Sequence, residues 1–123
     1  MTQENSNQLL LKDLCVRLPC HPRVKVWLKD GTTEEGTLDL EHNYGDVLRD
    51  AFYYNKIVKI KPYLRPMSSM TDEEKLMYEG LMIGTDNISY MLDVVDWLNA
   101  HHFDYRGLID KSLALDATGL NIY

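Results

Sequence analysis

The chain has 123 residues, of which 45% are hydrophobic and 26% are charged. These values are typical of a single globular domain and argue against a disordered, collagen-like or disulfide-rich protein. No apolar run approaches the roughly 18 to 20 residues that span a bilayer, and the polar start lacks the features of a signal peptide. We therefore expect a cytoplasmic protein with no membrane partner, in which Cys15 and Cys20 are reduced thiols.

The charge is distributed unevenly and divides the chain near Pro66. Residues 1–66 contain 10 Lys and Arg against 9 Asp and Glu, whereas residues 67–123 contain 3 against 10. Because the acidic second half is unsuited to a phosphate backbone, we expect any nucleic-acid contact in the first half. We predict a frayed start over residues 1–7, a helix and barrel-like sheet over 8–66, and an acidic helical half over 67–123, all within one domain.

The first half is predicted to begin with a helix and continue as a small sheet. Apolar residues between Leu9 and Leu18 follow a helical stripe that ends before two prolines, which predicts a short helix. From Arg23 the apolar residues recur at every second position up to the turn at Asp30, a pattern typical of a strand. Strands are predicted over residues 23–29, 37–41, 47–48 and 57–61, and the sheet is expected to end at Pro62.

The second half is predicted to be helical. Thr71 and Glu74 have the spacing of a capping box, which predicts a helix over residues 72–83. Apolar residues three and four apart predict an amphipathic helix over residues 87–100, and Asp104 is expected to cap a third, short helix. The predicted class is therefore α+β: an N-terminal helix, a small SH3-like antiparallel sheet or barrel, and two or three C-terminal helices.

Three phrases of the sequence resemble one family of proteins. They are LKDLC at residues 11–15, KPYLRPMSSMT at residues 61–71 and DWLNAHHFDYRGLI at residues 96–109. They look like small uncharacterised proteins of gut Bacteroidales genomes and of their phages or prophages. The resemblance implies a phage or mobile-element accessory protein that acts in the bacterial cytoplasm, and it supplies no chemistry, because that family carries no assigned activity.

Residues 9–51 resemble the first motif of Sm-like RNA-binding barrels. The resemblance lies in the short helix, the phrase VKVWLKDG at residues 24–31 and the later phrase VLRDA at residues 47–51. The family's Asp-x-x-Met-Asn phrase is missing between Leu38 and Val47, and its Arg-Gly motif is missing from residues 57–61. The resemblance therefore implies an SH3-like barrel shape without the RNA site.

The densest polar cluster follows the second predicted helix. Two imidazoles and a carboxylate within four residues are groups that can ligate a metal or transfer protons, and a neighbouring guanidinium can hold an anion. In the alternative interpretation, the histidines end one helix, the carboxylate caps the next, and the arginine pairs with a carboxylate. The candidate binding residues are Arg65, His101, His102, Asp104, Tyr105 and Arg106.

A second candidate surface lies on the predicted sheet. If Val24, Val26 and Leu28 face the core, the residues that alternate with them face outward. Lysines around a tryptophan suit single-stranded nucleic acid, because the lysines bind phosphates and the ring stacks on bases. Cross-strand pairing of these lysines with Asp39 and Glu41 is the structural alternative. The residues of this surface are Lys25, Trp27, Lys29, Lys59 and Lys61.

The sequence contains no nucleophile elbow, phosphate-binding loop, zinc-protease helix or dinucleotide fingerprint. The leading hypothesis is therefore a non-enzymatic phage or prophage accessory protein that binds a host or phage protein, or sequesters a small ligand, without a resident metal or cofactor. Two alternatives stay open: a nucleic-acid-binding module, and a metal-assisted hydrolase at residues 101–104. Six methionines and the aromatic residues also leave room for a homo-oligomer.

Overall fold

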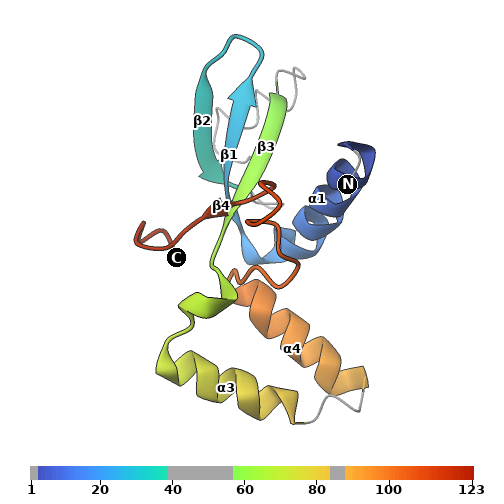
Figure 1. Ribbon diagram of the computed structural model, residues 1–123, viewed down its shortest axis with the longest axis vertical. Coiled ribbons are helices and arrows are strands. Elements are labelled where there is room, and N and C mark those ends of the chain that lie inside the picture. Colours follow the sequence, from blue (N-terminus) through green and yellow to red (C-terminus); the bar gives the residue numbers. More distant parts are fainter. Residues whose placement is uncertain (1–2, 39–56, 84–87) are drawn as a thin grey trace.

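A long helix, three strands and a helical hairpin follow one another along the chain, which then returns to add a fourth strand to the sheet (Figure 1). The computed structural model describes residues 3–38, 57–83 and 88–123. Its helices and strands are α1 (Gln3–Arg17), β1 (Arg23–Leu28), β2 (Thr33–Thr37), β3 (Ile57–Leu64), α3 (Asp72–Met82), α4 (Ile88–Ala100) and β4 (Leu115–Asp116). The predicted α+β class is confirmed.

The sheet has the strand order β2-β1-β3-β4. β1 is antiparallel to both of its neighbours, whereas β4 runs parallel to β3 and pairs with it at Tyr63 and Leu64. Within the described residues the sheet is therefore open and mixed, and the alternative of a closed antiparallel barrel is wrong. A bulge lies in the pairing of β1 with β3, between Trp27 and Leu28.

Three apolar clusters hold these elements together. Val24 and Val26, which alternate along β1, are completely buried against Leu14 of α1, as the period of two predicts. A second cluster joins α4 to the chain after it through Leu98 and Phe103, and a third buries Leu64 of β3. The hairpin of α3 and α4 extends away from the sheet (Figure 1).

Several boundaries in the first half differ from the predictions. α1 begins at Gln3, within the stretch over residues 1–7 that was predicted to be frayed. β2 begins at Thr33, directly after a tight turn in which the Asp30 carboxylate accepts hydrogen bonds from Thr32. Leu38 is buried just beyond β2. The remainder of the predicted strand over 37–41, and the one at 47–48, lie outside the described residues.

β3 continues past its predicted end at Pro62. This proline lies opposite Val24 of β1, and β4 begins to pair with β3 only at Tyr63. Pro62 therefore occupies a part of β3 that has one neighbouring strand among the described residues, which is where a sheet tolerates a residue without an N–H.

The helices of the second half agree with the predictions except for the last one. The capping box of Thr71 and Glu74 begins α3. The predicted third helix is replaced by turns, in which the Asp104 carboxylate accepts hydrogen bonds from the backbone N–H groups of Leu108 and Ile109. Gly107, which lies between Asp104 and Leu108, has a φ of 72°, a left-handed conformation that does not continue a helix. Among the described residues, no helix is both long and apolar enough to cross a membrane.

Candidate functional site

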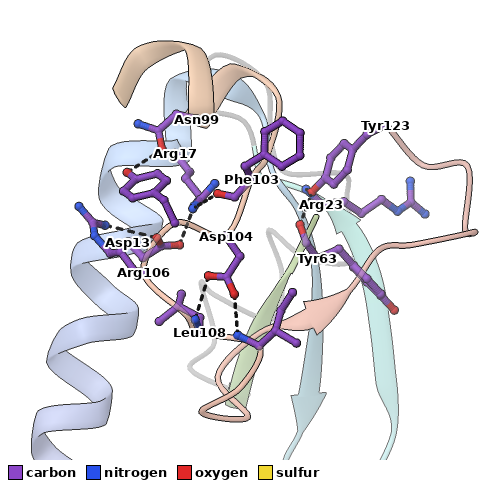
Figure 2. A network of polar contacts seen from close by, with 12 residues as sticks. Asp13, Arg17, Arg23, Tyr63, Asn99, Phe103, Asp104, Arg106, Leu108 and Tyr123 are labelled. Atoms are coloured by element: carbon purple, nitrogen blue, oxygen red, sulfur yellow. Dashed lines mark hydrogen bonds and ion pairs between the residues drawn. The ribbon is translucent and has the colours of Figure 1, made fainter. Parts of the chain in front are cut away.

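A buried ion pair within α1 is hydrogen-bonded to the turn that follows α4 (Figure 2). Arg17 Nε donates to Asp13 Oδ2 at 2.7 Å, and both side chains are 0% exposed. The other end of the Arg17 guanidinium donates to the backbone carbonyl of Phe103, also at 2.7 Å. Arg106 approaches the second Asp13 oxygen at 3.3 Å. The Asp13 carboxylate therefore holds two arginines, one of which binds a part of the chain far away in sequence.

Tyr105 and Arg106 belong to this buried network. The Tyr105 ring has two guanidinium groups near it, those of Arg17 and Arg106, each 5.1 Å from its centroid. The Tyr105 hydroxyl donates to Asn99 Oδ1 at 2.9 Å. Together with the turn that Asp104 holds, these contacts engage three of the candidate binding residues in structural roles.

Arg65 also has a structural role, because it forms an ion pair with Glu74 in the first turn of α3. Its guanidinium donates two hydrogen bonds to the Glu74 carboxylate, at 2.8 and 2.6 Å, and lies 4.2 Å above the Phe103 ring. The hydrogen bond from Arg65 lowers the pKa of Glu74 to about 2. This two-point pair occupies the donors of Arg65 that an anion at the start of α3 would need.

The two adjacent histidines point to different partners. His101 stacks on Trp97, with 4.5 Å between ring centroids, and its Nδ1 lies 3.5 Å from Glu74. His102 has a φ of 63° and stacks on Tyr123 at 3.6 Å. Burial, and then the electrostatic effect of Arg17, His101 and Arg65 nearby, lower the pKa of His102 to about 4.

The predicted histidine cluster therefore does not form a ligand set. The left-handed backbone at His102 separates the two imidazoles, and the Asp104 carboxylate is occupied by its own turn. In the described ranges, no group of three His, Cys, Asp or Glu side chains is placed to hold a metal ion. This arrangement gives the alternative of a metal-assisted hydrolase at residues 101–104 no support.

Four of the five residues of the second candidate surface do come together. The amino groups of Lys25, Lys59 and Lys61 lie 5.4, 4.3 and 5.7 Å from the centroid of the Trp27 ring. The register explains this, because Trp27 lies opposite Lys59 and Lys25 lies opposite Lys61. Lys29 follows the end of β1 and is not among these three lysines. The predicted partners Asp39 and Glu41 lie outside the described residues.

A cavity of about 690 Å³ lies beside Trp27, between β3 and α1. Its described lining includes Lys59 and Lys61 from the sheet and Lys111 from the turns after α4. No sequence pattern grouped Lys111 with the sheet, because the turns that carry it replace a predicted helix.

The helical hairpin carries a surface of exposed apolar side chains. Seven large apolar residues on α3, on α4 and next to them are between 51% and 86% exposed. They are Leu76, Met77, Ile83, Ile88, Tyr90, Met91 and Leu92, which we call the apolar hairpin patch. The helical periodicity of α4 indicated an amphipathic helix but could not indicate that its first turns lie beyond the core.

Comparison of the chain with protein-family models, with characterised proteins and with solved structures finds no match.

Proposed function

We propose that the protein is a non-enzymatic interaction module whose α3–α4 hairpin binds a basic amphipathic helix of a partner protein. The observation that carries this proposal is the apolar hairpin patch. Several large apolar side chains exposed on one helical hairpin mark a surface that another molecule covers. Side chains such as Ile83, at 86% exposed, and Ile88, at 75%, bury substantial apolar area when a partner helix packs on them.

The charge of the hairpin supports a basic partner. α3 and α4 contain one basic residue, Lys75, among six acidic ones. Glu74 is neutralised by Arg65, whereas the other five are exposed. An amphipathic helix with Lys or Arg beside its apolar stripe would match both features at once. The acidic residues are Asp72, Glu73, Glu74, Glu79, Asp93 and Asp96.

Methionine contributes to the patch at two positions, Met77 and Met91. Its unbranched, polarizable side chain adapts to partners of different shape. The resemblance to phage and prophage proteins is the reason to seek this partner among host or phage proteins in the bacterial cytoplasm.

The test measures binding of a synthetic Leu–Lys amphipathic helix to the wild type and to Ile83→Ser/Leu92→Ser. We expect the double variant to bind about 10-fold more weakly or worse, because it removes two large apolar side chains of the patch. Leu11→Ser is the matched control, because Leu11 is 63% exposed on α1, away from the hairpin. We expect this control, and circular dichroism of all variants, to resemble the wild type.

Two results would contradict the proposal. One is equal binding of the peptide by the wild type and Ile83→Ser/Leu92→Ser. The other is a wild-type dimer, detected by sedimentation, that this double variant dissociates, because a second copy of the chain would then cover the patch. A Leu–Glu helix of the same pattern should bind weakly, since the hairpin is acidic.

A further inference from the structure

We infer that the cavity between β3 and α1 binds a nucleotide unit, with its phosphate among the lysines and its base beside Trp27. This site is separate from the apolar hairpin patch, so the inference goes beyond the proposed function and does not rest on it. A free nucleotide and one unit of a single strand share this chemistry, and the experiment below distinguishes them.

The charge of the lining indicates an anionic ligand. Lys59, Lys61 and Lys111 line the cavity, and its described lining contains no Asp or Glu, although the whole chain has a net charge of -6. The ion pairs among the described residues involve none of these lysines. Like charges held close together repel each other, and a bound phosphate between them would remove that cost.

Lys61 is influenced by burial and by its neighbour Lys59. Burial, and then the charge of Lys59, lower the pKa of Lys61 below its ordinary value. A carboxylate carries one negative charge, whereas a terminal phosphate carries up to two, so the phosphate better matches a described lining that has three lysines and no acidic residue.

Trp27 and the apolar part of the lining indicate a flat aromatic group next to that phosphate. The half-buried Trp27 forms part of the wall, together with apolar side chains of α1 and β3 such as Leu10 and Ile60. An aromatic ring beside a basic groove is the combination with which proteins bind unpaired bases. The volume of about 690 Å³ lies within the range of small-ligand sites.

The edge of β3 adds backbone groups to the site. All five consecutive residues 57–61 line the cavity, although side chains of a strand point alternately to opposite faces. The cavity therefore runs along the edge of the strand, and among the described residues β4 covers this edge only from Tyr63 onward. The bulge at Trp27 lies in the same region. The backbone N–H and C=O groups along this edge, which no described strand covers before Tyr63, are suited to the polar edge of a base.

The test is fluorescence anisotropy of a labelled oligothymidylate, with competition by unlabelled thymidine monophosphate. We expect Lys59→Gln/Lys61→Gln and Trp27→Leu each to weaken binding by about 10-fold, since base stacking and phosphate contacts are each of that order. Lys12→Gln/Lys75→Gln is the matched control, because it removes two exposed charges from α1 and α3. We expect this control to bind within about 2-fold of the wild type.

Each outcome decides the inference. Displacement by the mononucleotide supports a free nucleotide as the ligand, and displacement by the unlabelled oligonucleotide alone supports a unit of a strand. If the folded wild type does not bind the oligonucleotide, the cavity is not a nucleotide site. If Lys12→Gln/Lys75→Gln weakens binding as much as Lys59→Gln/Lys61→Gln does, the binding is diffuse electrostatic attraction. Either result would overturn the inference. Ile83→Ser/Leu92→Ser should bind the oligonucleotide normally, so this test and the one for the hairpin fail independently.

Discussion

Asp13 and Arg17 are two charged side chains that folding removes from water, which costs free energy. Both are completely buried, and one guanidinium nitrogen of Arg17, Nη1, has no hydrogen-bond partner among the described residues. We predict that Asp13→Ala lowers the free energy of unfolding by about 3 to 5 kcal/mol, because it leaves two arginines without their carboxylate. Urea denaturation measures this change.

A double variant checks the cause of that loss. We expect Asp13→Leu/Arg17→Met to be more stable than Asp13→Ala, because it removes the buried cation together with its carboxylate. If the double variant were the less stable of the two, side-chain packing at this position, and not the unpaired charge, would dominate the loss.

His102 makes the stability of the fold depend on pH. Its pKa is about 4 in the folded protein, whereas an unfolded histidine titrates near 6.5. Between these values the unfolded chain binds the proton that the folded chain excludes, so stability falls as the pH is lowered from about 6.5 toward 4. Glu74 acts in the same direction at lower pH, since its pKa falls from 4.5 to about 2 on folding.

The variant His102→Asn tests this assignment, because asparagine tolerates the left-handed backbone at that position and does not titrate. We predict that unfolding of the wild type takes up close to one proton more than unfolding of the variant at pH between about 5 and 6. The measurement is the free energy of unfolding at several pH values in urea. Parallel curves for the two proteins over this range would contradict the prediction.

The residue types of the candidate sites were visible in the sequence, but their roles were not. His101, Asp104 and Arg106 have the composition of a reactive cluster, but His101 and Arg106 have partners that only the fold brings near, and Asp104 is bound within its own turn. By contrast, the gathering of lysines at Trp27 followed from the alternation along two strands. Periodicity carries information about which face a side chain occupies, whereas a partner 86 residues away, such as Phe103 for Arg17, leaves no local signal.

At the scale of elements, α3 is the helix whose beginning the sequence defines best. Thr71 Oγ1 accepts from the Glu74 N–H at 3.1 Å, and the Glu74 carboxylate accepts from the Thr71 N–H at 2.9 Å. We predict that Thr71→Ala destabilises the protein by about 1 kcal/mol, as the loss of an N-cap does. Thermal denaturation against Ser68→Ala, an exposed hydroxyl just before α3, checks the prediction. Equal effects of the two substitutions would count against the cap.

Sequence patterns over a few residues correctly predicted the helices and strands that contacts between nearby residues define. The period of two along β1 and the capping box of α3 both correspond to structure at their predicted positions. β2 begins at Thr33, ahead of the strand predicted over residues 37–41, of which only Thr37 and the buried Leu38 are described. The prediction of a third C-terminal helix was wrong, because an aspartate before an apolar run is also typical of the turn that Asp104 forms.

At the scale of the whole molecule, several contacts tie the two halves together. Arg65 and the residues after α4 exchange backbone hydrogen bonds of 2.8 Å, from Arg65 N–H to His102 and from Asp104 N–H to Arg65. The Tyr123 hydroxyl donates to the Tyr63 carbonyl in β3. We therefore predict one cooperative unfolding transition in urea. The fluorescence of Trp97, followed in Trp27→Phe, reports on the hairpin core, and the fluorescence of Trp27, followed in Trp97→Phe, reports on the sheet. The two signals should change at the same urea concentration. Separate midpoints would show that the halves unfold independently.

The bond from Arg17 to Phe103 also has a consequence for synthesis on the ribosome. The carboxylate that pairs with Arg17 emerges four residues before it, but the carbonyl it needs is made 86 residues later. At about 5 to 20 residues per second, that interval lasts roughly 4 to 17 s. Until then α1 carries a guanidinium that has not yet gained its final acceptor. The nascent first half is therefore expected to finish folding only when the turn after α4 has left the exit tunnel.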